Sequence, residues 1–379
     1  MKVLIVHNQL WAHYKAIIFN ELQQLIDKEE NTELLVVQLA MVEKSRTSLG
    51  QVDLASHRYN YKLVHEGTLE ELTLRQRLIG MMNAIRTFKP DVVNLTGYYD
   101  VASWMVLFYC KLVGIKTVLS NESTLGDHQR KGLKEQLKAF IIRQFDGYFN
   151  FGTRSAEYLL TLGAKPSQLL VNRNCVDNER LKEVFDQEKA LMQPKERRNF
   201  IFVGRLIPFK NLPSFMDALE MANQAVTQPW GFVILGEGEQ HTLLLEKSKS
   251  LSYPVTFHKG VAWDDVPRYL AHADVLVLPS SSEPWGLVVN EAMACGMPVA
   301  VSKKCGCAID LVKEGENGFT FDPQDVHKIK DVLVKIMDAN TDLHRLGRQS
   351  SAIIKEYSPE NVAKEMLEGF RKICQFGKK

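Results

Sequence analysis

Short apolar runs alternate with amphipathic stretches along the whole chain. In the first half, β-branched apolar runs predict strands, and apolar residues at helical spacing predict a helix after most of them. The predicted strands are Lys2–Val6, Leu34–Leu39, Val92–Leu95, Lys116–Ser120 and Tyr148–Phe151. The predicted helices cover residues 14–27, 69–88, 102–113, 132–145 and 155–162. Strands that are apolar at nearly every position are typical of parallel sheets covered on both faces.

A second series of the same kind follows a charged stretch, Asp177–Asn199, which we interpret as the connection between two domains. Its predicted strands are Phe200–Val203, Gly231–Leu235, Val255–His258, Val275–Leu278, Val299–Ser302 and Gly318–Phe321. Two successive series predict an α/β protein with two doubly wound, Rossmann-like domains, residues 1–175 and 176–358. We expect the last helix, residues 359–379, to pack back on the first domain.

The composition limits the class of protein but indicates no particular reaction. The chain has 379 residues, 45% hydrophobic and 24% charged, with a formal net charge of +2. These values exclude a disordered chain or a coiled coil, and the charge does not favour a nucleic-acid partner. The six cysteines match no common metal spacing, the N-terminus resembles a strand rather than a signal peptide, and no apolar run is long enough to span a membrane. We therefore expect a cytoplasmic protein.

The segment from Ser282 to Val299 combines carboxylates with a helix start. Glu283 lies in a loop after a predicted strand, a helix begins near Leu287, and Glu291 follows about one turn later. Free N–H groups at a helix start can bind an anion, and carboxylates accept hydrogen bonds from vicinal hydroxyls. The pattern indicates a pocket for a sugar, a diphosphate and a ribose. The alternative is a helix whose N-terminal acids are simply exposed.

Two cations follow the first strand of the second domain. Arg205 comes directly after Gly204, and Lys210 stands five positions later. Ligands bind at the carboxyl ends of strands in open α/β sheets, so both side chains are placed to meet a diphosphate there. The alternative is a pair of solvated surface cations.

These motifs together resemble a known family. Gly204-Arg205 with Lys210, Glu283-x7-Glu291 and Gly296-Met297-Pro298-Val299 are similar to the retaining family-four glycosyltransferases, whose GT-B fold has two Rossmann-like domains facing across a cleft. The resemblance covers nearly all of the second domain and is mainly architectural in the first. It implies hexosyl transfer from a nucleotide-diphosphate sugar to a saccharide or a lipid-linked saccharide, in polysaccharide biosynthesis.

The resemblance also implies a role for each matching position. Arg205 and Lys210 would hold the donor diphosphate beside Gly204, and Glu283 would accept hydrogen bonds from the donor sugar. The remaining donor contacts would come from the backbone of Gly286 and Leu287, the Glu291 carboxylate on the ribose, and the backbone of Val261 at the base.

The first domain departs from the family pattern. Many relatives have a Gly-Gly pair after the first strand, whereas this chain has a loop that ends in His13 and Tyr14, which we take as acceptor-side candidates. Many relatives also carry a histidine where this chain has Glu122. We predict that Glu122 takes that place and faces the sugar as a catalytic group; the alternative is an acid that caps the next segment.

No Asp-x-Asp pair occurs in the chain, so we expect no metal and no other cofactor. Arg205, Lys210 and a helix N-terminus could stabilise the leaving diphosphate instead. Retention of configuration then favours front-face departure and attack.

Residues 130–143 carry basic and apolar residues at helical spacing, which is typical of a helix lying on an anionic membrane. Peripheral contact with the inner face of the cytoplasmic membrane is one interpretation, and an ordinary helix covering the sheet is the other.

Other function classes stay as alternatives. A nicotinamide dehydrogenase is disfavoured because the nearest glycine motif, Gly236–His241, lacks its third glycine. A sugar phosphorylase or nucleotide-sugar epimerase of the same fold remains open, as does a non-catalytic sugar-nucleotide binding protein.

Overall fold

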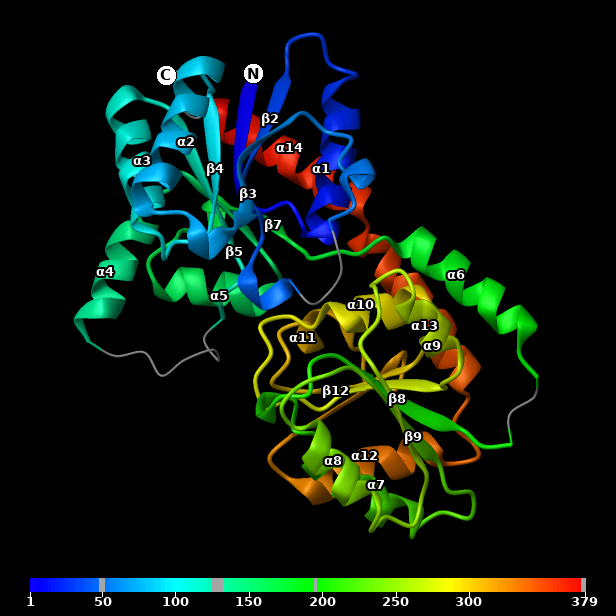
Figure 1. Cartoon of the computed structure of the whole chain (residues 1–379). Coiled ribbons are helices and arrows are strands. Elements are labelled where there is room, and N and C mark those ends of the chain that lie inside the picture. Colours follow the sequence, from blue (N-terminus) through cyan, green and yellow to red (C-terminus); the bar gives the residue numbers. More distant parts are fainter. Residues whose placement is uncertain (48–51, 125–131, 194–195, 376–379) are drawn as a thin grey trace. The chain divides into compact units, whose positions relative to one another are not determined.

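A computed structural model describes residues 1–47, 52–124, 132–193 and 196–375. It divides into two compact units (Figure 1). Unit 1 comprises residues 1–175 and 359–379, and unit 2 comprises residues 176–358. Each unit has its own parallel sheet with helices on both faces. None of the described helices is long and apolar enough to cross a membrane.

Unit 1 has a seven-stranded sheet of order β3-β2-β1-β4-β5-β6-β7, and every pair is parallel. Its strands are β1 (Lys2–Gln9), β2 (Glu33–Val42), β3 (Tyr61–Thr68), β4 (Val92–Thr96), β5 (Lys116–Asn121), β6 (Gly147–Asn150) and β7 (Leu169–Asn172). Its helices are α1 (His13–Ile26), α2 (Leu74–Phe88), α3 (Val101–Val113), α4 (Leu133–Ile142), α5 (Thr153–Thr161) and α14 (Pro359–Gln375).

The last helix belongs to the core of unit 1. α14 lies beside α1 (Figure 1), and Phe370 packs edge-on against Phe149 of β6 at 5.0 Å between ring centroids. Val362, Met366 and Phe370 are buried at helical spacing on the same face. Residues 376–379 lie outside the described part of the chain.

The sequence prediction missed both edge strands of this sheet. β3 contains Lys62, His65 and Glu66 and has no fully buried position, so it lacks the apolar run by which the other strands are found. β7 has four residues. The predicted helix 69–88 begins instead at Leu74, because Thr73 forms a capping box with Gln76.

Unit 2 has a six-stranded parallel sheet of order β10-β9-β8-β11-β12-β13. Its strands are β8 (Asn199–Val203), β9 (Gly231–Leu235), β10 (Val255–His258), β11 (Val275–Leu278), β12 (Val299–Ser302) and β13 (Gly318–Phe321), which confirms the six predicted positions. Its helices are α6 (Asn178–Leu191), α7 (Leu212–Asn223), α8 (His241–Ser248), α9 (Val266–Ala271), α10 (Leu287–Ala294), α11 (Ala308–Leu311), α12 (Val326–Met337) and α13 (Leu343–Ile354).

The interpretation of residues 177–199 as a connecting linker is wrong. Most of this stretch forms α6, which packs against α9 and α10 within unit 2. Leu181, Val184 and Phe185 are buried at helical spacing, and the charged residues occupy the outer face. The high charge density concealed an amphipathic helix that begins at its cap Asp177.

Both sheets reverse their strand order at the first strand of the unit. In unit 1, β1 lies between β2 and β4, and in unit 2, β8 lies between β9 and β11. The loops that leave two such strands diverge to opposite faces and open a crevice at their carboxyl ends. Each unit therefore has one topologically favoured place for a ligand.

Candidate active site

The crevice of unit 2 begins with two loops whose backbones touch. Gly204 follows β8 with φ +148°, and Gly236 follows β9 with φ +151°. A Cβ on Gly236 would lie 1.9 Å from the Gly204 carbonyl oxygen. The loops are also joined by Leu206 N–H, which donates to the Glu237 carbonyl oxygen at 2.8 Å. Glycine is therefore required here by close backbone approach as well as by φ.

Lys210, Glu283 and two glycines form one continuous group at this edge. The Lys210 ammonium donates to the Glu283 carboxylate, and both side chains are largely buried. A Cβ on Gly204 would lie 3.9 Å from Lys210 Cε, and one on Gly286 would lie 3.4 Å from Glu283 Cγ. The structure thus brings residues after β8 and β11 together, but it pairs Lys210 with Glu283 directly, which the separate roles inferred from sequence did not anticipate.

The loop that carries Glu283 is anchored on both sides. Gly306 N–H donates to the Glu283 carbonyl oxygen at 2.9 Å, and Cys307 N–H donates to the Trp285 carbonyl oxygen at 3.1 Å. The buried Trp285 indole donates to Asn290 Oδ1 at 2.8 Å, so this tryptophan has a packing role. These contacts hold the Glu283 backbone in one position.

The start of α10 is open to a ligand. Gly286 is its N-cap with φ +102°, and no side chain caps the helix. The first backbone hydrogen bond of the helix is donated by Val289 N–H to the Gly286 carbonyl oxygen, so the N–H groups of Leu287 and Val288 are placed to bind an anion. Arg205, on the neighbouring loop, is exposed and has no ion pair within the described ranges. A guanidinium and free amides at one edge suit a diphosphate.

Glu291 differs from the other carboxylates of the site. It lies in the second turn of α10, and burial raises its pKa to about 7 from an ordinary value of 4.5. Near neutral pH the protonated and the ionised forms of Glu291 therefore coexist. The protonated form can donate a hydrogen bond, and the ionised form accepts one. This suits contact with a pair of hydroxyls, because each hydroxyl can donate or accept.

Val261 lies beyond β10, two loops away from Gly204. Gly236 N–H donates to the His258 carbonyl oxygen at 3.0 Å, and a Cβ on Gly260 would lie 3.9 Å from Glu237. The Val261 backbone is thus at the same edge of the sheet, at the end of a continuous row of loops.

Unit 1 brings a different set of residues to its own crevice. Glu122, directly after β5, is half exposed, and its Oε1 lies 3.3 Å from Nζ of Lys15 in the first turn of α1. Lys15 is buried, and its ammonium lies 3.6 Å from the centroid of the Phe151 ring. Together with His7 they line a hollow of about 30 Å³.

Sequence reasoning did not single out Lys15. The buried face of α1 runs through Lys15, Ile18, Phe19, Leu22 and Ile26, so the lysine occupies a position of the apolar stripe. That position was the only available signal. His7 is also buried, and its pKa falls to about 4 because of burial and the nearby ammonium.

The acceptor-side candidates lie at the start of the same helix. His13 and Tyr14 are half buried, with ring centroids 5.6 Å apart, and the Tyr14 ring lies 5.3 Å from the Lys15 ammonium. Both therefore stand near the carboxyl end of β1.

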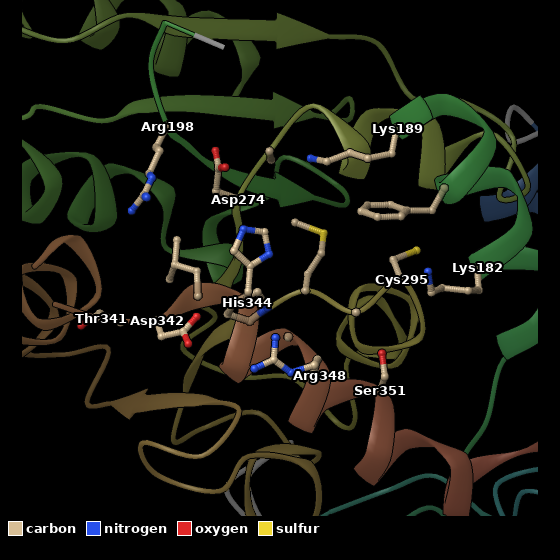
Figure 2. Close-up of a pocket in the computed structure, with 17 residues that line it drawn as sticks. Lys182, Lys189, Arg198, Asp274, Cys295, Thr341, Asp342, His344, Arg348 and Ser351 are labelled. Atoms are coloured by element: carbon tan, nitrogen blue, oxygen red, sulfur yellow. The ribbon is translucent and has the colours of Figure 1, made fainter. Parts of the chain in front are cut away.

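A larger hollow of about 560 Å³ lies at the other edge of the unit 2 sheet (Figure 2). Its walls include Arg198, Asp274 and Pro298, which directly precede β8, β11 and β12, together with His344 and Arg348 of α13. This hollow is thus at the amino ends of the strands, whereas the glycine loops after β8 and β9 and the start of α10 lie at the carboxyl ends. Volume alone does not identify the favoured crevice in this unit.

No group of three or more His, Cys, Asp or Glu side chains suited to a metal occurs among the residues that the structure describes. Cys305 and Cys307 are both buried.

Residues 184–352 match the family model described as glycosyl transferases group 1. The sulfoquinovosyl transferase of Arabidopsis thaliana is 27% identical over 77% of this chain and 56% of its own length. An Escherichia coli protein named UDP-Gal:alpha-D-GlcNAc-diphosphoundecaprenol alpha-1,3-galactosyltransferase is 31% identical over 46% of each chain. The chain thus spans about half the length of the curated relatives it matches.

Solved structures agree over the whole chain. HepE from Anabaena, crystallised with UDP, has a TM-score of 0.73 over 98% of this chain and 100% of its own, at 17% sequence identity. This level of identity supports the fold alone, and the fold is that of two Rossmann-like parallel-sheet domains, as in GT-B proteins.

Proposed function

We propose that this chain, whose residues 184–352 form a glycosyl transferases group 1 domain, moves a sugar from a nucleotide-diphosphate sugar to a hydroxyl of a saccharide or lipid-linked saccharide. The proposal rests on one observation: Lys210 and Glu283 form a pair beside the uncapped start of α10 at the crevice between β8 and β11, with Arg205 on the loop after β8. Cations with free amides recognise a diphosphate, and the carboxylate recognises sugar hydroxyls.

The donor would bind along the row of loops in unit 2. Arg205 and the α10 amides contact the diphosphate, with Lys210 bridging it to Glu283. The Glu283 carboxylate accepts hydrogen bonds from the sugar, beside the backbone of Gly286. The ribose diol lies on Glu291 and the base against the Val261 backbone. This order places charge opposite charge and hydroxyls opposite carboxylates.

Transfer would proceed with retention and without a metal ion. The bond between the anomeric carbon and the leaving phosphate oxygen breaks, and Arg205 with Lys210 stabilises the negative charge that develops. The acceptor hydroxyl attacks from the same face, its oxygen bonds to the anomeric carbon, and its proton passes to the diphosphate. Glu122 of unit 1 would accept a hydrogen bond from the sugar during this step, with the acceptor on His13 and Tyr14.

A surface of unit 1 supports a lipid-linked acceptor. α3 and α4 present exposed apolar side chains next to one another, with the Phe108 and Phe140 rings stacked at 6.2 Å. The α3–α4 surface consists of Tyr99, Met105, Phe108, Leu112, Leu133, Leu137 and Phe140. Exposed apolar groups gathered in this way mark a binding surface more often than a solvated helix face.

Lysines flank the α3–α4 surface, which favours an anionic bilayer as its partner. Lys134 is exposed on α4, and Lys138 lies 5.6 Å from the Tyr99 ring. Residues 130 and 131 of the basic segment lie outside the described ranges. A relative whose name includes diphosphoundecaprenol is consistent with a lipid-linked acceptor. We therefore propose that the protein contacts the inner face of the cytoplasmic membrane.

Flotation with vesicles tests the membrane assignment. We expect the protein to float with vesicles containing a third phosphatidylglycerol and to stay at the bottom with pure phosphatidylcholine. Replacing exposed Leu133, Leu137 and Phe140 by serine should abolish flotation, whereas serine at exposed Leu243 and Leu245 of unit 2 should not. If the variant with three serines floated as well as the control with two serines, the α3–α4 surface would not be the membrane-binding surface.

The activity is tested with a panel of nucleotide sugars. Binding is measured by thermal shift, because a donor at 100 times its Kd adds about 2.7 kcal/mol of stability. Transfer is then followed with the donor that binds, with and without EDTA, and the anomeric configuration of the product is determined by NMR. Restoration of lost activity by Mn²⁺ after EDTA would contradict metal independence. Sugar phosphate formed from a glycoside, an epimerised donor, or binding without product would favour the alternative functions.

A further inference from the structure

We infer that Lys15 is a positioning residue that holds the Glu122 carboxylate in one orientation at the crevice of unit 1, an inference that rests on the proposed function. Glu122 is a predicted catalytic residue, but no sequence motif includes Lys15, and the segment that matches the family model begins only at residue 184. Lys15 and Glu122 lie 107 positions apart in the sequence, and the fold brings their side chains into contact.

The location of the pair connects it with a ligand site. Glu122 follows β5, and Phe151, which covers the Lys15 ammonium, follows β6. The hollow beside them is also lined by Thr96, the last residue of β4. All of these positions are at the carboxyl ends of β4, β5 and β6, on one side of the strand-order reversal at β1, and an open α/β sheet binds its ligands at the carboxyl ends of its strands.

The two side chains differ in accessibility, and this difference separates their roles. The Lys15 side chain is 8% exposed, whereas that of Glu122 is 53% exposed. A substrate can therefore reach the Glu122 carboxylate but not the ammonium. Lys15 acts on a substrate only through its carboxylate partner, which makes it a positioning residue.

Burial of the ammonium must be compensated. Desolvation lowers the pKa of Lys15, and Glu122 raises it again. The Phe151 ring, 3.6 Å away, contributes a cation–π contact. The other titratable groups around the ammonium are His7, Tyr14 and Cys175. Burial and the nearby ammonium keep His7 neutral at pH 7, so Glu122 is the carboxylate partner that the structure shows for Lys15.

An unsupported Glu122 would behave differently. A half-exposed carboxylate with no partner samples several rotamers and is solvated by water, so fewer molecules present it in the productive orientation. If Lys15 only filled the core of unit 1, its replacement by methionine would lower neither stability nor activity, since an apolar side chain of similar length suits this site at least as well. A loss of activity on this replacement would therefore be due to the lost orientation of Glu122, since packing alone does not predict it.

A double-mutant cycle on Lys15→Met and Glu122→Gln tests the inference in the full-length protein. We expect Lys15→Met to lower kcat roughly ten- to hundredfold with little change in the donor KM, because Glu122 acts on the transition state. In the Glu122→Gln background, Lys15→Met should cause no further loss. The control is Lys116→Met, which breaks a pair with Asp146 at the amino end of β5 and should leave kcat unchanged.

Stability supplies an independent readout. Glu122→Gln leaves the buried ammonium without its carboxylate and should lower the melting temperature, whereas Lys15→Met should not. Full and equal losses of kcat for Lys15→Met in both backgrounds would overturn the inference, as would unchanged kcat in the single variant. A wild-type protein that transfers no sugar from any donor overturns the proposed function, and this inference with it.

Discussion

The crevices of the two units share a strand order but have opposite chemistry. In unit 2 the loops after β8 and β9 contain glycines whose backbones touch, and the start of α10 has no side-chain cap. In unit 1 the equivalent place is occupied by a buried ammonium, its carboxylate partner and an aromatic ring. One crevice therefore exposes backbone N–H groups for an anion, whereas the other presents a single side chain from a tightly packed edge.

This contrast shows how little the shared topology determines. The reversal at β1 and at β8 creates both crevices, but the residues on the loops decide what each can bind. Under the proposed function, unit 2 recognises the diphosphate and unit 1 contributes groups for the sugar and the acceptor.

The largest expected effect concerns the cations of the unit 2 crevice. Arg205→Ala and Lys210→Met should each lower kcat roughly hundredfold or more, because each removes a donor for the leaving diphosphate. The control is Arg348→Ala, an exposed arginine of unit 2 at the opposite edge of the sheet, in the hollow of Figure 2. The measurement is kcat of the three variants by steady-state kinetics. An equal loss of kcat in Arg348→Ala would show that the effect does not depend on a cation being at the crevice.

A smaller effect is expected from the contact between glycine loops. Gly236→Ala would put a Cβ 1.9 Å from the Gly204 carbonyl oxygen in a backbone conformation with φ +151°. We expect a loss of about 2–3 kcal/mol in the free energy of unfolding, measured in urea, and weaker donor binding. Gly260→Ala is the matched control, since its Cβ would have only Glu237 nearby, at 3.9 Å. Similar stability of the two variants would show that the loops separate readily.

The smallest effect is an opposite pH dependence of the two units. Burial lowers the pKa of His7 and His57 of unit 1 to about 4 and raises that of Glu291 of unit 2 to about 7. The two histidines have an ordinary pKa of 6.5 in the unfolded chain. Between pH 4 and 6.5 the unfolded form of unit 1 therefore binds more protons than the folded form, so the stability of unit 1 falls as the pH drops through this range. Folded unit 2 keeps the Glu291 proton that the unfolded form loses near 4.5, so this contribution is lost as the pH rises through 7.

Hydrogen exchange resolves the units separately. After correction for the intrinsic exchange rate, protection in unit 1 should be lower at pH 5 than at pH 7, whereas unit 2 should gain protection. Glu291→Gln should remove that gain, because an amide does not titrate. A gain in unit 2 that persists in the variant would assign the effect to another group.

The sequence determined most of the fold because buried parallel strands have apolar residues at nearly every position. All six strands of unit 2 and five of unit 1 were located in this way, whereas β3, with exposed polar positions, and β7, with four residues, escaped. The sequence also predicted Arg205, Glu283 and Glu291 as site residues, since the first two stand in loops after a strand and Glu291 stands about one turn into the following helix. Their proposed chemical roles still await the kinetic experiments above.

Only the tertiary structure decided which side chains meet. The Lys210–Glu283 pair joins loops after β8 and β11, and the Lys15–Glu122 pair joins α1 to the end of β5. Each partner alone is a charged residue, which in sequence is typical of a solvated surface. The sheet order brings the partners together, and burial then turns an ordinary charge into a group that needs its partner. That requirement is set by the surroundings of the side chain, which the linear pattern does not contain.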